Sequence, residues 1–145
     1  YQGMVDEVQN HLREFAAALP GSAQPAHFHL LGTSSTVTTL AGVHLGLPRY
    51  DRRAVDGIWM SSDQVSTIVS RLLAMSYPER VQSACIGTER ADLVLAGCAI
   101  LDGIRNVFPS DRVRVADRGL REGILMQLMV EDGVLIITEK KNESI

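Results

Sequence analysis

The feature that most constrains the fold of this chain is a succession of strand, small-residue turn and helix that occurs twice. The first copy covers residues 27–45 with its turn at 32–35, and the second covers residues 112–129 with its turn at 117–119. Units of this kind are typical of α/β folds, in which such turns follow the carboxyl ends of strands. We therefore predict an α/β fold whose two strands share one sheet and whose turns lie at the same edge.

The hydrophobic pattern assigns most of the other residues to helices. Apolar residues that recur at steps of three and four indicate helices, and Ser61 with Gln64 forms the pattern of a capping box at the start of one of them. The run from Arg90 to Phe108 is apolar on nearly all sides, which is typical of a buried helix. The expected helices are 4–19, 36–45, one that follows Ser61, 78–81, 90–108 and one that starts at 120, and the expected strands or extended segments are 27–31, 55–60, 112–116 and 134–138.

The last helix has an apolar side that we expect to face the core. Its inward residues are predicted to be Leu120, Ile124, Leu125, Leu128 and Met129. We assign a single α/β lobe to residues 1–138 and a solvated tail to residues 139–145. The chain starts with Tyr1 and not with Met, and a helical pattern follows almost at once. We therefore expect it to be a piece of a longer protein.

Composition and charge argue for a folded domain and against two classes of partner. Of the 145 residues, 46% are hydrophobic and 21% are charged, which is enough apolar material for one core. A net charge of −3 gives no overall positive field that could attract nucleic acid, so we expect no DNA partner. No apolar run approaches the roughly 20 residues that span a membrane, and no secretory signal is visible. We expect a cytoplasmic protein whose Cys85 and Cys98 are reduced, buried thiols.

The two turns are the candidate ligand sites. Each places backbone N–H groups and the positive end of a helix beyond a strand, an arrangement that favours phosphate. Gly32 and Gly119 would let a ligand approach the backbone closely. The alternative for Thr33, Ser34 and Ser35 is that they only cap a helix, because such residues are preferred N-caps. Two such turns in one small chain favour the binding interpretation.

Two arginines and two histidines also have competing interpretations. Arg90 is either solvated or aimed at an anion. Arg121 would lie in the first turn of its helix, where the dipole disfavours a cation, so its position calls for an anionic partner. His27 and His29 share one side of a strand and could hold a metal, but no third ligand is in sight.

A serine nucleophile in the first turn is the remaining alternative. Ser34 or Ser35 would need a neighbouring base, and the surroundings show no Gly-x-Ser-x-Gly pattern. The sequence therefore offers no nucleophile with a recognisable activating group.

Three segments, by their order and spacing, resemble one protein family. They are Gly32–Ala41 (GTSSTVTTLA), Glu89–Gly97 (ERADLVLAG) and Asp117–Leu125 (DRGLREGIL). Together they resemble the exopolyphosphatase/guanosine pentaphosphate phosphohydrolase family, Ppx/GppA, from about Met4 to Met129. The resemblance is specific for the family and much less specific for any one member.

The resemblance implies a ribonuclease-H-like lobe of the actin-like ATPase and sugar kinase superfamily, helix-rich with a small sheet. The chain is similar to the later part of the second of two lobes around a cleft, and Arg90 matches a family arginine that faces this cleft. The family usually has Gly where this chain has Ser35, which argues against very close contact between that backbone and a ligand. The expected phosphate- or nucleotide-binding residues are Gly32, Thr33, Ser34, Ser35, Arg90, Gly119 and Arg121.

The resemblance also implies a hydrolase that uses Mg²⁺ to release terminal phosphate from inorganic polyphosphate or guanosine pentaphosphate. In the family, the first phosphate loop, the catalytic Glu and a Gly-rich phosphate loop precede the matching region, and none of them occurs in these 145 residues. We therefore expect this chain to contribute ligand binding, no catalytic residue and no metal ligand. The missing N-terminal part of the protein is the expected partner, and a homodimer is a possible assembly.

Two other functions stay open at this stage. A non-catalytic module that binds a nucleotide or an alarmone, such as guanosine tetraphosphate, would use the same turns and Arg90 without turnover. A sugar-kinase-type phosphotransferase is a weaker alternative, because the second and third segments are less similar to those families. The sequence upstream of Tyr1 would separate the enzyme from the binding module, because only the enzyme needs the Gly-rich loop and the catalytic Glu.

Overall fold

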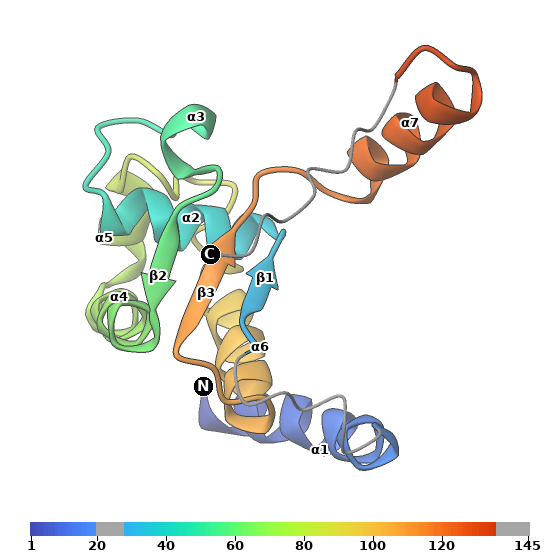
Figure 1. Cartoon of the computed structure of the whole chain (residues 1–145). Coiled ribbons are helices and arrows are strands. Elements are labelled where there is room, and N and C mark those ends of the chain that lie inside the picture. Colours follow the sequence, from blue (N-terminus) through green and yellow to red (C-terminus); the bar gives the residue numbers. More distant parts are fainter. Residues whose placement is uncertain (20–27, 136–145) are drawn as a thin grey trace, which may run out of the picture.

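The computed structural model describes residues 1–19 and 28–135, and Figure 1 shows their arrangement. These residues form helices joined to a small sheet, as the sequence predicts. The helices are α1 (Gln2–Ala18), α2 (Ser35–His44), α3 (Arg52–Val55), α4 (Ser62–Ala74), α5 (Tyr77–Gln82), α6 (Val94–Val107) and α7 (Leu120–Glu131), and the strands are β1 (Leu30–Gly32), β2 (Trp59–Ser61) and β3 (Arg112–Val115).

The sheet has the strand order β1-β3-β2. β1 runs parallel to β3 with Gly32 opposite Val115, and β2 runs antiparallel to β3 with Met60 opposite Val113. Because adjacent parallel strands end at the same edge, the two turns lie next to each other there. The prediction of one shared sheet with both turns at one edge is confirmed.

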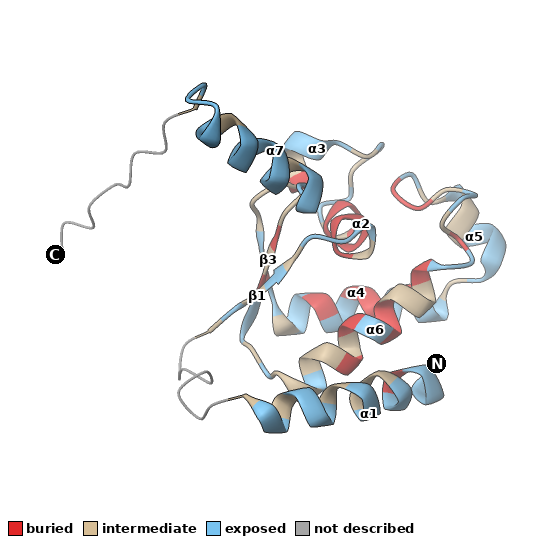
Figure 2. Cartoon of the chain, turned by 90° about the vertical axis from the view of Figure 1, so that its right-hand side faces the viewer, coloured by how far each residue is buried: buried red, intermediate tan, exposed pale blue. Residues whose placement is uncertain are grey.

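Helices α2, α4 and α6 lie on one side of the sheet (Figure 2), and the core is formed between them and the strands. α2 lies deepest, with every residue from Val37 to Val43 buried. Leu40 of α2, Met60 of β2 and Leu72 of α4 are the largest fully buried side chains. This burial fixes α2 rigidly, and α2 carries the first turn at its N-terminus.

The N-terminal helix α1 packs against α6 at the end of the molecule that lies opposite the two turns. Phe15 and Phe108 meet there edge to face, with ring centroids 6.1 Å apart. The Tyr1 hydroxyl donates a hydrogen bond to Asp102 of α6 at 2.7 Å. α1 thus supports α6 from the side opposite the turns.

Two local predictions around Ser61 have different outcomes. The capping box is confirmed, because Ser61 Oγ accepts from the N–H of Gln64 and the Gln64 side chain accepts from the N–H of Ser61. The extended segment expected at 55–60 is shorter, because the short helix α3 ends only at Val55. Asp51 starts α3 by accepting a hydrogen bond from the N–H of Arg53 at 2.9 Å, as Asp commonly does at an N-cap.

The helix predicted for residues 90–108 begins at Val94 instead. Gly87 adopts a positive φ of 70°, and the chain then continues in turns that include Arg90 before α6 starts. The apolar pattern also overstates the burial of this helix, because Ile100 is 51% exposed. Arg90 therefore lies on a turn, and α6 is buried on part of its surface only.

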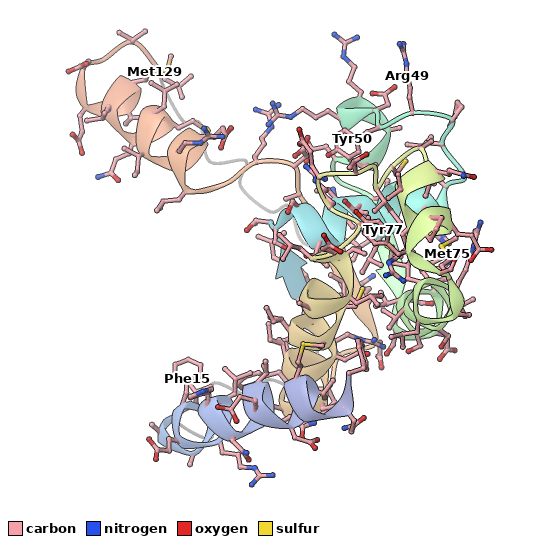
Figure 3. All side chains as sticks on the ribbon, turned by 180° about the vertical axis from the view of Figure 1, so that it is seen from behind. Phe15, Arg49, Tyr50, Met75, Tyr77 and Met129 are labelled. Carbon is pink, nitrogen blue, oxygen red and sulfur yellow. The ribbon has the colours of Figure 1, made fainter. Side chains whose placement is uncertain are left out.

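The expectation that α7 turns its apolar side inward is wrong. Leu120 is 80% exposed, Leu125 is 58% exposed, and no residue of the helix is buried. The helix projects from the sheet edge (Figure 1), and Met129 lies far from the core in Figure 3. The spacing of apolar residues identifies an apolar face but does not say what that face packs against.

The strand expected at 134–138 is not formed in its described part. The N–H groups of Val134 and Leu135 both donate to the carbonyl of Met129, which closes the end of α7. Residues 136–138, the tail at 139–145 and His27 lie outside the described residues.

The two cysteines are buried, and no described helix is suited to crossing a membrane. Cys85 and Cys98 are both free and buried, as predicted. Burial raises the pKa of the Cys98 thiol to about 12, so the thiol stays protonated at neutral pH. Within residues 1–19 and 28–135, no helix has the length and apolar character needed to cross a membrane.

Candidate phosphate-binding site

The first turn presents three hydroxyl side chains at the end of β1. Thr33, Ser34 and Ser35 are all exposed. Ser34 Oγ accepts a long hydrogen bond from the N–H of Val37 at 3.5 Å, so Ser34 is the N-cap of α2. Packing requires the glycine at Gly32, because a Cβ there would lie 2.7 Å from the Val37 side chain. Capping and packing thus account for Ser34 and Gly32, whereas Thr33 and Ser35 each line a hollow.

The second turn ends at Gly119, the N-cap of α7. The N–H of Gly119 donates to the Glu122 carboxylate at 2.8 Å, and this bond is the main reason that the pKa of Glu122 lies below its usual value. Glu122 therefore already occupies one of the amides expected for phosphate. Arg121 follows in the first turn of α7, is exposed, and supplies positive charge at this helix end.

A hollow of about 450 Å³ joins the two turns. The N–H of Ala116 donates to the carbonyl of Gly32 at 2.9 Å, which holds the two strand ends together. The hollow is lined by Thr33, Arg52, Asp117, Arg118, Gly119, Leu120, Arg121 and Glu122. Three of the predicted binding residues, Thr33, Gly119 and Arg121, therefore share one hollow.

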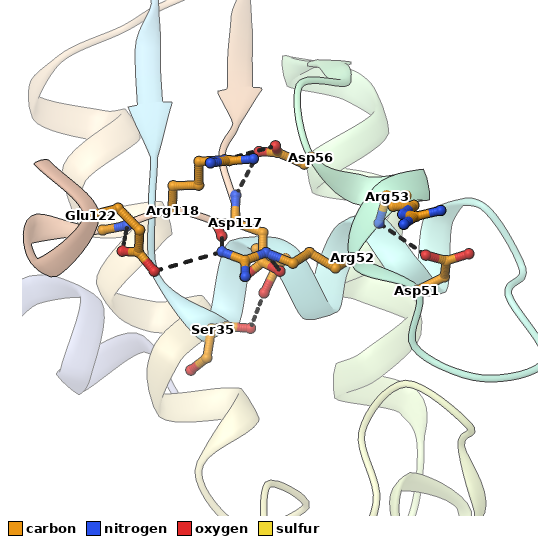
Figure 4. A network of polar contacts seen from close by, with 10 residues as sticks. Ser35, Asp51, Arg52, Arg53, Asp56, Asp117, Arg118 and Glu122 are labelled. Carbon is orange, nitrogen blue, oxygen red and sulfur yellow. Dashed lines mark hydrogen bonds and ion pairs between the residues drawn. The ribbon is translucent and has the colours of Figure 1, made fainter. Parts of the chain in front are cut away.

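Helix α3 contributes Arg52 to this hollow, a residue that the sequence analysis did not single out. Its Nε lies 3.1 Å from the Asp117 carboxylate, its Nη2 lies 3.7 Å from the Glu122 carboxylate, and it also donates to the Asp117 carbonyl. Figure 4 shows the Arg52 side chain extending from α3 toward Asp117 of the second turn and Glu122 of α7. The pair of arginines after Asp51 signals a basic helix start, but no pattern says that Arg52 faces the turn.

Asp56 holds the second turn from the other side. Its carboxylate accepts from the N–H of Asp117 at 2.9 Å and lies 3.6 Å from Arg118 Nε (Figure 4). The backbone hydrogen bond, followed by the nearby Arg118 charge, holds the pKa of Asp56 below its usual value. The turn is therefore fixed by charged groups from α3 and from the loop after it, before any ligand binds.

Arg90 lies in a separate, smaller cavity. Its Nη1 donates to Oγ1 of Thr39, a buried residue of α2, at 2.9 Å. The cavity measures about 80 Å³ and is lined by Ser35, Thr36, Thr39, Arg90, Leu93 and Val94. The structure thus brings Arg90 next to Ser35, but it does not place Arg90 in the hollow that holds Gly119 and Arg121.

The Tyr50 side chain lies close enough to both Asp117 and Arg90 for their charges to affect its pKa, and the sequence analysis did not single it out. Burial raises the pKa of Tyr50, Asp117 raises it further, and Thr38 and Arg90 oppose the increase. The charges of Asp117 and Arg90 therefore act on the phenol in opposite directions. A lone Tyr beside Pro48 and Arg49 gives no signal of this position in the sequence.

The chain matches the model of the Ppx/GppA phosphatase family over residues 2–132. This chain belongs to the Ppx/GppA family. Among curated proteins, the comparison found no match.

Solved structures with the same fold include several Ppx/GppA proteins. An exopolyphosphatase-like protein is 26% identical with a TM-score of 0.77, and the match covers 92% of this chain and 43% of that one. A Ppx/GppA family member of Aquifex aeolicus is 23% identical with a TM-score of 0.72, covering 91% and 42%. An exopolyphosphatase of Cytophaga hutchinsonii is 21% identical with a TM-score of 0.71, covering 91% and 41%.

These comparisons confirm the predicted fold class and show how much of the matched structures this chain covers. The chain is a helix-rich α/β lobe of the actin-like type with a small mixed sheet, as the resemblance implied. It spans about two fifths of the length of the structures that it matches.

The described residues of this Ppx/GppA lobe do not provide enough side-chain ligands for a Mg²⁺ site. No group of three His, Cys, Asp or Glu side chains among them could hold a metal ion. The carboxylates in the hollow, Asp117 and Glu122, both face Arg52. His29 packs edge to face against Trp59 with ring centroids 4.7 Å apart, which accounts for its position without a metal.

The contacts of Asp56 and Glu122 also make the second turn sensitive to pH. Both carboxyls have a folded-state pKa below the unfolded one, so they stabilise the turn at pH values above the usual carboxyl range. That stabilisation is lost as the pH falls through the folded-state pKa values. Acid should therefore loosen the turn while the apolar core is still intact.

Replacing Arg52 by Gln is expected to loosen the second turn without unfolding the lobe. The substitution removes the cation between Asp117 and Glu122, so amide hydrogen exchange over residues 117–123 should accelerate several-fold. Because the Arg52 side chain is 53% exposed, the free energy of unfolding should fall by less than about 1 kcal/mol. Arg53→Gln is the matched control. Equal exchange in both variants would show that Arg52 does not hold the turn.

Proposed function

We propose that this Ppx/GppA chain forms the phosphate-binding part of a phosphohydrolase that releases terminal phosphate from inorganic polyphosphate or guanosine pentaphosphate. The observation that carries the proposal is the hollow in which Thr33, Gly119 and Arg121 meet at the carboxyl ends of two parallel strands. Ligands of open α/β sheets bind at this edge. Membership of a phosphatase family supports phosphate as the ligand.

The side chains present suit binding and charge neutralisation. Arg121 and Arg90 supply positive charge, and Thr33 and Ser35 supply hydroxyl groups that can donate to phosphate oxygens. Hydrolysis of a phosphoanhydride also needs a positioned water and a group that orients it. Of the carboxylates of the hollow, Asp117 is paired with Arg52, and Glu122 is paired with Arg52 and accepts from the N–H of Gly119, so neither suits that task.

The rival function is a non-catalytic module that binds a nucleotide or an alarmone through the same residues. It is supported by the same absence of an unpaired carboxylate in the hollow. The coding sequence upstream of Tyr1 separates the two functions, because the enzyme requires a Gly-rich phosphate loop and a catalytic Glu there.

We expect these 145 residues alone to bind phosphate compounds weakly and to hydrolyse none of them. A positioned catalytic group contributes about 10² or more to such reactions, and the chain offers none. The test incubates the chain with polyphosphate and with guanosine pentaphosphate plus Mg²⁺ and measures released phosphate beside an active exopolyphosphatase. Sustained release that Arg90→Ala abolishes would place catalytic groups in this chain and overturn the proposal.

A further inference from the structure

The face of the sheet opposite α2, α4 and α6 carries a cluster of basic and aromatic side chains. Met60, Val113 and Val115 point to the core and are buried. Residues alternate along a strand, so their neighbours Trp59 and Arg114 point to the other face. Figure 2 shows the three helices gathered on one side of the sheet.

The cluster is built across all three strands. Trp59 of β2 pairs with Arg114 of β3, and Arg114 pairs with Leu31 of β1. The guanidinium carbons of Arg112 and Arg114 lie 4.3 Å and 4.9 Å from the Trp59 ring centroid. His29 touches the edge of the same ring. We call these residues, His29, Leu31, Trp59, Arg112 and Arg114, the sheet-face cluster.

Glycine at position 57 leaves room for one of the arginines. Gly57 has a φ of 83°, and a Cβ there would lie 3.2 Å from the Arg114 guanidinium. The Arg114 side chain therefore lies across the backbone of the loop that precedes β2. This position holds its charge on the sheet face instead of letting it extend into solvent.

The charge of the cluster is not neutralised locally. Among the described residues, neither Arg112 nor Arg114 has an acidic side chain within 4.0 Å, whereas Arg52, Arg105 and Arg118 all do. Arg112 is exposed and Trp59 is 38% exposed. Two adjacent arginines without an acidic partner on an accessible face attract anions.

We propose that the sheet-face cluster binds the chain of a linear polyphosphate outside the hollow between the turns. This inference rests on polyphosphate being a ligand of the protein, as proposed above. A phosphate chain has a charge on every unit and needs only closely spaced cations, which Arg112 and Arg114 provide. The site would hold a distant part of a long substrate, so it would favour long chains over short ones.

The geometry favours a polyphosphate over a single-stranded nucleic acid. Nucleic acids that bind without sequence preference stack their bases on exposed aromatic rings. Both guanidinium groups already lie against the Trp59 ring, so a base would have to displace them.

Trp59 is the only tryptophan of the chain, so its fluorescence reports this surface directly. Long-chain polyphosphate bound to guanidinium groups that lie 4.3 Å and 4.9 Å from the ring centroid should change the Trp59 emission. Arg112→Gln/Arg114→Gln should abolish this response, weaken long-chain binding about tenfold and reduce the salt dependence of log K by about 1.5. Tripolyphosphate, which is too short to reach both sites, should bind both proteins equally.

Arg13→Gln/Arg71→Gln is the matched control, because it removes the same charge from exposed positions on α1 and α4. Equal weakening in the control, or an unchanged Trp59 signal with wild-type protein, would overturn the proposal. Tighter binding of poly(U) RNA than of polyphosphate would assign the surface to nucleic acid instead. Arg90→Gln separates the two proposals, because it should reduce tripolyphosphate binding and leave the Trp59 response intact.

Discussion

Replacing Arg90 by Gln is expected to weaken binding of tripolyphosphate to this chain by about tenfold or more. A guanidinium can hold two phosphate oxygens at once and carries a fixed charge, whereas Gln can form hydrogen bonds but cannot neutralise charge. Arg90 lies beside Ser35 in one cavity and is kept in place by Thr39. Isothermal titration calorimetry at low salt measures the effect. In an active phosphatase with this lobe, phosphate release should fall by a similar factor.

Two further variants distinguish ligand binding from a structural role of Arg90. Arg49→Gln removes the same charge from an exposed loop position and should change the affinity little. Thr39→Val removes the hydroxyl that orients Arg90, so it should weaken binding less than Arg90→Gln does. If Arg90→Gln left the affinity unchanged and lowered the unfolding temperature as much as Thr39→Val, the Arg90 guanidinium would only support α2.

The edge of the sheet could be predicted because its signals are local. A strand, a turn of small residues and an N-cap at Ser34 are encoded within a few adjacent positions, and parallel pairing then follows from the connection through helices. The same reasoning placed Thr33, Gly119 and Arg121 near each other, and the structure places all three in one hollow. Local patterns thus sufficed for the part of the site that strand geometry determines.

The rest of the site depends on contacts between distant segments, which the pattern does not encode. Arg52 and Asp117 are brought together because α3 follows α2 back to the sheet edge, and nothing in the sequence around Arg52 indicates an acidic partner 65 residues away. Arg90 was assigned to a helix because apolar residues follow it, but the positive φ at Gly87 keeps it on a turn. Because Arg90 lies on this turn, it lines the small cavity beside Ser35 and not the hollow that contains Gly119 and Arg121.

Helix α7 shows the same limit for packing. Its apolar spacing is that of a core helix, yet Ile124 and Leu128 are about half exposed in the described part of the chain. The spacing encodes an apolar face, and only the arrangement of other segments decides whether that face is covered. The chain spans about two fifths of the length of the solved structures that it matches.

Replacing Gly97 by Val is expected to lower the free energy of unfolding by about 3 kcal/mol, the largest effect on stability that we predict. α6 crosses the first turn of α2 at this glycine, and a Cβ there would lie 2.9 Å from Thr36 Cγ2 and even closer to Thr36 Oγ1. Because α2 is buried from Val37 to Val43, it cannot move aside. Chemical denaturation measures the change in the free energy of unfolding.

A double-mutant cycle assigns this loss to the contact between the two helices. Thr36→Ala removes the two closest side-chain atoms, so the combined variant Thr36→Ala/Gly97→Val should be more stable than the sum of the single changes predicts. Gly123→Val on α7 is the control, because a Cβ there meets nothing within 4 Å and should change stability by less than about 0.5 kcal/mol. Additive effects of Thr36→Ala and Gly97→Val would contradict the close crossing.

Gly97→Val should also reduce tripolyphosphate binding, because Ser35 directly precedes Thr36 and a shift of the first turn of α2 would move it. Thr36→Ala in the same chain should partly restore this binding.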